Sequence, residues 1–394
     1  MSISLIDFKK EVYDEFNNIL NYWAKYSIDT KNGGFFGTVN GENIGDLMAD
    51  KGIVLNSRIL WTFSHAYIEN KNPEYLKITK RAFEYIKKYF WDAKNGGVYW
   101  SVMANGQPAE TRKIIYGHSF AVYGASEYFR ATGSKSALLF AQDIFNSIIK
   151  HSYDAKMGGY IEAYGQDWSE INDYLLAKGD SRKSMNTHLH LMECFANLYR
   201  VDKSESVRFH LQHCIEIVLD KIIGKDSTRQ TLFFTENWEP RSKGISYGHD
   251  IESSWLIQES AEILGNEELT KRAKAKCIEM ARSACEGLQA DDGMIYEFDP
   301  ENAHSNSSRD WWVMAEAMVG FYNAYQNTGK EHYLEKSVKS WEFIKKYLID
   351  KEKGEWFGGV TPDHKVVGTS KITMWKCPYH NARACLEIYH RIAP

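Results

Sequence analysis

The residues best suited to chemistry gather in one short stretch, residues 246–255. There His249 and Glu252 are three residues apart, so on a helix the imidazole and the carboxylate share a face. A carboxylate beside an imidazole fixes its tautomer and raises its basicity, which suits proton transfer near neutral pH. The same residues could also form a helix cap with a structural histidine. We therefore interpret the stretch as a candidate proton-transfer site that depends on what the rest of the chain supplies.

Further polar and aromatic side chains recur near the start of other apolar, helix-forming segments. Burying polar groups in a helical core costs free energy, so their recurrence at helix starts indicates a shared site. Histidines on three of these segments could converge in a bore, although each alone could be a core histidine. Besides His249 and Glu252, the candidate site residues are Arg58, Tyr116, Asn186, His190, Trp255, Trp312, Glu316 and His380.

The sequence predicts neither a metal site nor a nucleotide cofactor. His188 and His190 are close in sequence, but side chains two apart on a helix diverge, so the pair is a poor chelate and we interpret His188 as structural. Neither a GxxxxGK nor a GxGxxG loop occurs, and no Ser-His-Asp arrangement stands out.

The elements that must position these residues are marked by a recurring turn of the type Asp-x-Lys-x-Gly-Gly. Asp, Asn and Gly make the turn, and the bulky residues that follow make a short strand. A spacing of roughly 60–70 residues is a repeat signature. Copies begin at Asp29, Asp92 and Asp154, weaker ones begin at Asp291 and Asp350, and residues 226–234 fill the missing position without the glycine pair.

Two helical patterns fit between successive turns. The first is apolar and rich in small residues, as in a helix packed on all sides, and the second is amphipathic, as in a surface helix. One helix at each end of the chain completes six pairs. The predicted helices are 5–26, 52–69, 73–91, 116–132, 135–151, 185–200, 204–223, 249–264, 267–286, 310–328, 330–349 and 378–392.

Six pairs in which inner and outer helices alternate can close into a ring. We predict an all-α (α/α)6 toroid with short β-strands in the connecting loops, formed by residues 1–394 as a single domain. The alternative is an open α-solenoid. Closure is favoured because each end of the chain supplies only half a pair. If the inner helices run parallel, their N-termini gather at one mouth, where the candidate residues would meet.

Composition limits the partners that this chain can have. A net charge of −4 gives no broad attraction to nucleic acid or to an anionic membrane surface. The six cysteines are scattered without a CxxC pair, and charged residues interrupt any apolar leader at the N-terminus. No apolar run approaches the length of a membrane span. We therefore expect a cytoplasmic monomer that acts on a small molecule.

Five motifs at the helix starts are specific in combination: NSRILW (56–61), MNTHLH (185–190), SYGHDIE (246–252), WWVMAE (311–316) and WKCPYHN (375–381). In these residues the chain resembles the N-acylglucosamine 2-epimerase superfamily, and most closely its cellobiose 2-epimerase branch, over nearly its whole length. The resemblance implies the (α/α)6 fold predicted above, with no required metal or nucleotide.

The resemblance also implies roles for the site residues. His249 and His380 resemble the two acid/base residues of the family, and Glu252 resembles the partner of the first histidine. His190 resembles a third histidine that assists ring opening and binding, and Arg58 resembles the residue that steadies the enediolate oxygen. Trp312 and Glu316 resemble residues of the sugar subsites. From their positions at the starts of the inner helices, we also expect Asn186, Tyr116 and Trp255 to contact the substrate.

The implied activity is epimerisation at C2 of the reducing-end sugar of a β-1,4-linked disaccharide such as cellobiose, lactose or mannobiose. It requires an open-chain aldehyde, removal of the C2 proton and its return to the opposite face. Two histidines can do this if one ring is neutral and the other charged near pH 7. Arg58 would stabilise charge on the former aldehyde oxygen.

Four alternatives share the predicted scaffold. The nearest are an aldose–ketose isomerase of the mannose isomerase type and an N-acylglucosamine 2-epimerase. A glycoside hydrolase would need two carboxylates at a set separation, whereas histidines dominate this mouth. A non-catalytic sugar- or protein-binding toroid would depend on the aromatic residues and tolerate loss of the histidines.

Overall fold

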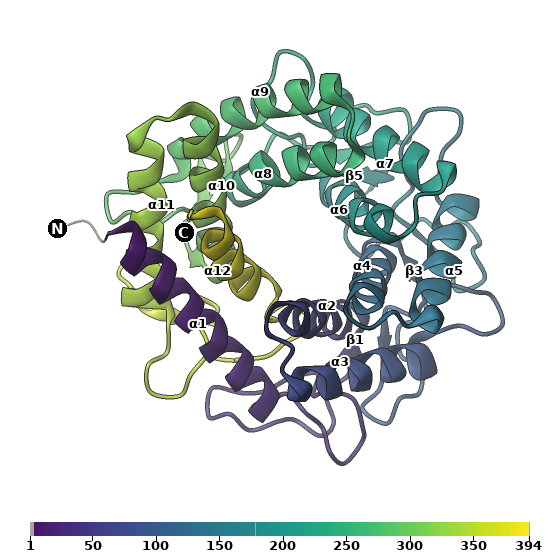
Figure 1. Cartoon of the computed structure of the whole chain (residues 1–394). Coiled ribbons are helices and arrows are strands. Elements are labelled where there is room, and N and C mark those ends of the chain that lie inside the picture. Colours follow the sequence, from purple (N-terminus) through teal and green to yellow (C-terminus); the bar gives the residue numbers. More distant parts are fainter. Residues whose placement is uncertain (1–3, 178, 394) are drawn as a thin grey trace.

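Helices make up most of the chain in the computed structural model, which describes residues 4–177 and 179–393. They alternate along the sequence between an inner and an outer ring (Figure 1). The inner ring consists of α2 (Ile53–Asn70), α4 (Ile115–Thr132), α6 (Met185–Val201), α8 (Tyr247–Leu264), α10 (Trp311–Thr328) and α12 (Tyr379–Arg391). The outer ring consists of α1 (Leu5–Tyr26), α3 (Pro73–Tyr85), α5 (Lys135–His151), α7 (Glu205–Ile217), α9 (Glu267–Ala284) and α11 (Glu331–Phe343).

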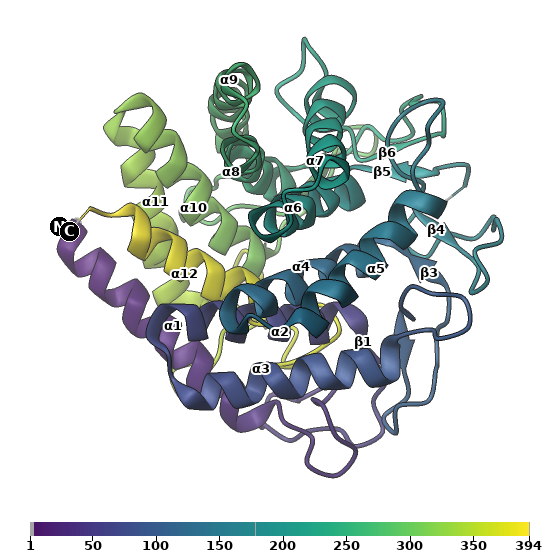
Figure 2. The ribbon, with the colours of Figure 1, turned by 45° about the vertical axis from the view of Figure 1, so that its right-hand side comes forward.

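The ring closes where the two ends of the chain meet. Helix α1 packs along α12, and α12 in turn packs against α10 and α2 (Figures 1 and 2). The Lys9 ammonium reinforces the junction by donating to the carbonyl of Ile392 at 2.7 Å. The predicted (α/α)6 toroid is therefore confirmed, and the open solenoid is wrong.

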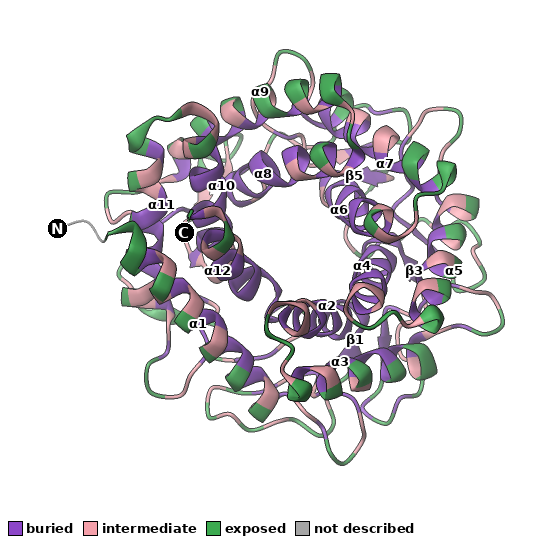
Figure 3. Ribbon diagram, in the orientation of Figure 1, coloured by how far each residue is buried: buried purple, intermediate pink, exposed green. Residues whose placement is uncertain are grey.

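The inner helices are buried on nearly every side, whereas the outer helices expose one face (Figure 3). Small residues permit this close packing: a Cβ on Gly124 would lie 2.7 Å from the carbonyl of Ser57, so only glycine lets α2 and α4 come so near. A Cβ on Gly320 would meet the carbonyl of Ile251 at 2.6 Å in the same way. None of the helices in the described part of the chain is both long and apolar enough to cross a bilayer.

Four of the predicted outer helices, those that correspond to α3, α7, α9 and α11, extend further than the regular α-helices of the structure. Their final turns have a wider or a tighter winding, which accounts for the difference at their C-terminal ends. Three of these turns are π-helical, η1 (Ile86–Phe90), η2 (Val218–Ile223) and η4 (Ile344–Leu348), and one is a 3-10 turn, η3 (Cys285–Gly287).

Short antiparallel strands link neighbouring pairs at the end of the ring where the inner helices begin. A bridge between Val39 and Ile372 joins the first of these connections to the last. The strand pairs are β1 (Lys51–Gly52) with β2 (Ser101–Val102), β3 (Lys113–Ile114) with β4 (Ala163–Tyr164), and β5 (Lys183–Ser184) with β6 (Phe233–Phe234). The two three-stranded sheets are β7 (Ile245–Ser246), β8 (Glu297–Asp299) and β9 (His304–Asn306), and β10 (Arg309–Asp310), β11 (Gly359–Val360) and β12 (Val366–Val367).

A buried ion pair ties each regular turn to the start of an inner helix. In the second turn, Oδ1 of Asp92 accepts the backbone N–H of Asn95 at 3.1 Å, and Oδ2 meets Nζ of Lys113 at 2.8 Å. Gly96 and Gly97 have φ values of 75° and 72°, in the left-handed region that favours glycine. Because Lys113 lies directly before α4, the pair fixes where that helix begins. The same pairing recurs at Asp29–Lys51, Asp154–Lys183, Asp350–Lys371 and Asp291–Arg309.

Substitution of Lys113 by Met should destabilise the protein, because it leaves the carboxylate of Asp92 buried without its cation. We expect the free energy of unfolding to fall by about 3–5 kcal/mol in urea titrations. Lys365→Met is the matched control, since the Lys365–Asp363 pair is exposed and should contribute at most about 1 kcal/mol. Equal stability of the two variants would contradict this account of the turns.

Candidate active site

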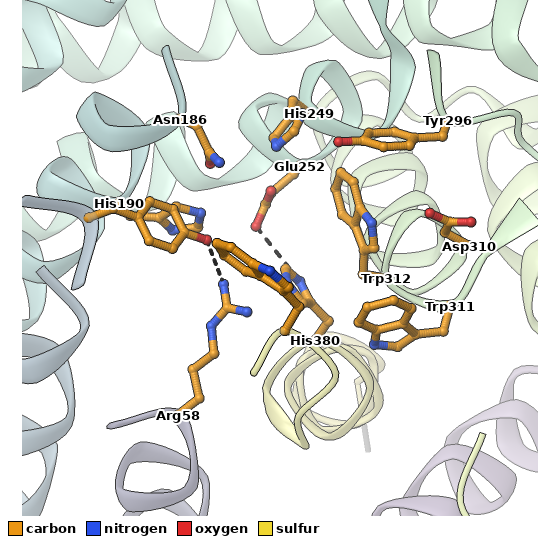
Figure 4. Close-up of a pocket in the computed structure, with 12 residues that line it drawn as sticks. Arg58, Asn186, His190, His249, Glu252, Tyr296, Asp310, Trp311, Trp312 and His380 are labelled. Carbon is orange, nitrogen blue, oxygen red and sulfur yellow. Dashed lines mark hydrogen bonds and ion pairs between the residues drawn. The ribbon is translucent and has the colours of Figure 1, made fainter. Parts of the chain in front are cut away.

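The N-terminal halves of the inner helices enclose a buried cavity of about 300 Å³ (Figure 4). Every inner helix contributes at least one side chain, as expected if parallel inner helices gather their N-termini at one mouth. The lining residues are Arg58, Tyr116, Asn186, His190, His249, Glu252, Tyr296, Asp310, Trp311, Trp312, Trp375 and His380.

Most of the site residues predicted from the sequence meet in this cavity, but Trp255 and Glu316 do not line it. They lie behind its wall, where the indole N–H of Trp255 donates to Oε2 of Glu316 at 2.9 Å. Both side chains are almost fully buried. Their position supports a structural connection to the site in place of the predicted contact with a sugar.

His249 and His380 converge on the cavity from α8 and α12. The indole of Trp312, on the intervening helix α10, lies close to both rings, with centroid distances of 4.8 Å to His249 and 5.6 Å to His380. In Figure 4 the two imidazoles point into the same part of the cavity. Residues more than a hundred positions apart thus supply two bases to one small space.

Each of these histidines has a different partner on Nδ1. Ser246 contacts Nδ1 of His249 through its hydroxyl at 2.7 Å, and Glu316 contacts Nδ1 of His380 through its carboxylate at 2.7 Å. Glu252 was expected to be the partner of His249, but its Oε1 lies 3.9 Å from Nδ1 of His380. The shared helix face was inferred correctly, yet the side chain of Glu252 turns toward α12 because a cation on that helix attracts it.

That cation is Arg383, which lies one turn after His380 and is almost fully buried. Its Nη2 donates to Glu316 at 2.6 Å and to Glu252 at 3.1 Å. Its Nη1 donates to Glu193 and to the hydroxyl of Tyr379. One guanidinium therefore holds carboxylates from α6, α8 and α10.

His190 and Arg58 form the other side of the cavity. His190 meets Glu193 through Nδ1 at 3.0 Å and lies edge-on to Tyr116, with ring centroids 5.1 Å apart. Arg58 donates from Nη2 to the hydroxyl of Tyr116 at 2.9 Å, and its guanidinium lies 4.2 Å from the ring centroid of Phe120. Since no carboxylate pairs with Arg58 in the described residues, its charge is directed at the cavity.

Burial favours the neutral form of both histidines. It lowers the pKa of His249 to about 3, with a smaller effect from His190. It also holds the pKa of His380 well below the ordinary value, and the charges of Arg58 and Arg383 add to that shift. The protein groups around the two rings therefore do not by themselves give the expected charged ring near pH 7, because they replace part of the water that would stabilise an imidazolium.

The carboxylates respond to the same environment in opposite ways. Burial, followed by the charge of Glu316, raises the pKa of Glu252 well above the ordinary value. Burial opposes the charge of Glu193 too, but Arg383, His190 and Tyr379 together outweigh it and lower the pKa of Glu193 to about 2. The two carboxyl groups that contact Arg383 from α6 and α8 thus have pKa values shifted in opposite directions.

His249→Asn should change how stability depends on pH. The folded wild type keeps His249 neutral down to about pH 3, whereas the unfolded chain protonates it near 6.5. Wild-type stability should therefore fall relative to the variant by about 1.4 kcal/mol per pH unit as the pH drops below 6.5. Urea titrations from pH 7.5 to 4.5 measure this difference. The exposed His332→Asn variant should track the wild type, and a His249→Asn curve parallel to the wild type would contradict a neutral His249.

Glu252, Glu316 and His380 place potential ligand atoms within 4.8 Å of one another. Arg383, however, already donates to both carboxylates, so the positive charge that a cation would supply is present. His188 faces away from the cavity, as interpreted from the sequence: its Nδ1 meets the carbonyl of Ser184 and its Nε2 accepts the N–H of Tyr160. We therefore assign no metal to this cavity.

Two important residues escaped the sequence analysis. Glu193 stands three residues after His190, which is the spacing that drew attention to His249 and Glu252, so the same signal could have found it. Tyr296 lies in a loop after the weak turn at Asp291, and only the folded ring brings it to the cavity. The sequence pattern predicts only that a bulky residue such as Tyr296 follows each turn, and not that its side chain faces the cavity.

Fold and cavity together define a class of protein: a closed (α/α)6 barrel with a buried polar site where its inner helices begin. Within that class, the family model for N-acylglucosamine 2-epimerase matches residues 33–384. The chain is 42% identical to a cellobiose 2-epimerase of Bacteroides fragilis over 384 residues, which cover 96% of this chain and 98% of the relative. The chain therefore belongs to the N-acylglucosamine 2-epimerase family, and its resemblance to the cellobiose 2-epimerase branch is confirmed.

Solved structures support the same family assignment. The cellobiose 2-epimerase of Spirochaeta thermophila superposes with a TM-score of 0.93 at 37% identity, covering 98% of this chain and 97% of that one. A D-mannose isomerase superposes with a TM-score of 0.88 at 19% identity, covering 99% of this chain and 100% of that one. At that identity the second likeness shows the fold alone.

Proposed function

We propose that this protein is a carbohydrate 2-epimerase that inverts C2 of the reducing-end sugar in β-1,4-linked disaccharides of the cellobiose type. The observation that carries the proposal is the convergence of His249 and His380, from separate inner helices, on one cavity, where both rings lie close to the indole of Trp312. Inversion at one carbon needs two proton-transfer groups, and a single group would have to turn the intermediate over. The similarity to cellobiose 2-epimerases supports the substrate class.

The reaction begins when the sugar ring opens to its aldehyde, a step in which His190 would exchange protons with the ring and hydroxyl oxygens. One neutral imidazole then accepts the C2 proton, and the electron pair left at C2 moves onto the aldehyde oxygen. Arg58 stabilises the resulting negative oxygen, since its buried guanidinium lines the cavity and lacks a carboxylate partner among the described residues. Proton return to the opposite face of C2 gives the epimer.

Proton return requires that the second imidazole be charged when the intermediate forms. Burial favours the neutral form of both rings, so the donating ring must take up a proton from solvent, and the negative charge that develops on the substrate raises the pKa of that ring so that it does. His380 is well suited to carry this charge because the carboxylate of Glu316 accepts a hydrogen bond from its Nδ1. Ser246 offers His249 only a neutral hydroxyl.

Turnover of cellobiose in deuterated water should place deuterium at C2 of the epimer, because an imidazolium proton exchanges with solvent between transfers. Proton NMR of the product measures the label and its position. Retention of the original proton at C2 would count against proton exchange. A ketose product carrying the label at C1 would instead favour the aldose–ketose isomerase.

His249→Ala and His380→Ala should each lower kcat by about 10²–10⁴-fold, the usual contribution of a general acid or base. Chromatographic assays with cellobiose, mannobiose, mannose and N-acetylglucosamine measure the loss and the substrate preference together. His332→Ala is the control, since this exposed ring lies outside the cavity. Near-wild-type activity of either His249→Ala or His380→Ala would rule out the two-histidine mechanism.

A further inference from the structure

One end of the cavity plays no part in proton transfer. Its lining there includes Tyr296, Asp310 and Trp311, which lie on the other side of Trp312 from Glu252 (Figure 4). The epimerisation chemistry needs none of these side chains. Polar groups that face a buried cavity without a role in the chemistry suggest contact with another part of the ligand.

Asp310 is unusual for its position in the fold. It occupies the N-cap of α10, where an aspartate normally accepts a hydrogen bond from the first turn of the helix, yet its side chain makes no such bond. Its Oδ1 accepts a hydrogen bond from the hydroxyl of Ser308, and no Lys, Arg or His among the described residues pairs with it. The carboxylate therefore gives up its local partner and faces the cavity.

The surroundings of Asp310 would disfavour an anionic ligand. Burial raises the pKa of Asp310. Glu297, on the neighbouring β8, also lacks an ion pair within the described chain, and burial together with the charge of Asp310 raises the pKa of this carboxyl group. Two partly buried carboxyl groups without a cation would repel phosphate or a uronic acid. They are suited to accept hydrogen bonds from neutral hydroxyl groups.

The remaining groups at this end complement such a ligand. Trp312 and Tyr296 meet edge to face, with centroids 5.2 Å apart, and offer apolar ring surface. The Trp311 ring also lines this end of the cavity. A carboxylate acceptor and aromatic faces together match a sugar ring, which carries hydroxyls on its rim and apolar C–H groups on its faces.

We propose that Asp310 is a specificity-determining residue that accepts hydroxyl hydrogen bonds from the neutral sugar linked to the reacting one. This proposal rests on the epimerase function. It explains how the enzyme would bind two-ring substrates in preference to one-ring sugars. Since Asp310 lies apart from the histidines, it should act on binding and leave the proton-transfer steps unchanged.

The test compares Asp310→Asn and Asp310→Ala with the wild type on cellobiose and on mannose, which lacks the second ring. We expect KM for cellobiose to rise about ten- to a hundredfold in Asp310→Ala, as for loss of a hydrogen bond to a charged group, with a smaller rise in Asp310→Asn. For both variants kcat on cellobiose and all parameters for mannose should stay near wild type. Asp363→Asn is the matched control, because this exposed aspartate lies beside β12 of the same sheet.

Three results would overturn the proposal: an unchanged KM for cellobiose, an equal loss of kcat/KM on both sugars, or a fall in kcat alone. Calorimetric binding of cellobiitol and glucitol, the reduced two-ring and one-ring sugars, gives a second measure that needs no turnover. In this assay Asp310→Ala should weaken the binding of cellobiitol ten- to a hundredfold and leave the binding of glucitol unchanged. A wild type that binds cellobiitol but forms no epimer would refute the epimerase function alone, so the two failures can be told apart.

Discussion

The candidate site depends on one buried guanidinium. Arg383 is held among the carboxylates of Glu193, Glu252 and Glu316, which come from three different inner helices. A guanidinium is suited to this position because it stays charged and presents several donors in a fixed plane. Removal of one member of a buried ion pair costs about 3–5 kcal/mol, so the cluster also fixes how α6, α8, α10 and α12 lie against one another.

Through its carboxylates, Arg383 acts on two of the three cavity histidines. Glu193 connects it to Nδ1 of His190, and Glu316 connects it to Nδ1 of His380. These contacts orient both imidazoles and leave their Nε2 atoms for the cavity. His249 stands outside the network, with the Ser246 hydroxyl as its partner. The two proposed proton-transfer residues thus have different electrostatic surroundings, as a reaction that needs both an acid and a base requires.

Close packing of the ring is what allows so polar a site to be buried. At four of the turns a buried lysine or arginine lies directly before an inner helix and pairs with the first aspartate of the turn. Lys371 pairs with Asp350 in the same way in the connection that leads to α12. Glycines such as Gly124 and Gly320 then let neighbouring inner helices approach to backbone contact. With the helix starts fixed in this way, burial in the cavity wall shifts the pKa values of His249 and Glu252 in opposite directions.

The sequence by itself determined the fold and most of the cavity. Two patterns in the sequence were enough for this. The spacing of the recurring Asp-x-Lys-x-Gly-Gly turn gives the number of repeats, and the contrast between apolar and amphipathic helices distinguishes the inner ring from the outer ring. Polar residues at the inner helix starts then predicted Arg58, Tyr116, Asn186, His190, His249, Glu252, Trp312 and His380, which all line the cavity. Helical spacing, however, reports only which side chains share a face on one helix.

Tertiary structure alone decided which groups pair across helices. Glu252 and His249 share a face, yet the side chain of Glu252 turns to Arg383, 131 residues further along the chain. Glu316 was expected at a sugar, but the same guanidinium and His380 draw it behind the cavity wall. Tyr296 reaches the cavity from the connection before β8, whose path no local pattern encodes. In each case the deciding force is the cost of burying an unpaired charge or polar group, which depends on neighbours that only the closed ring brings together.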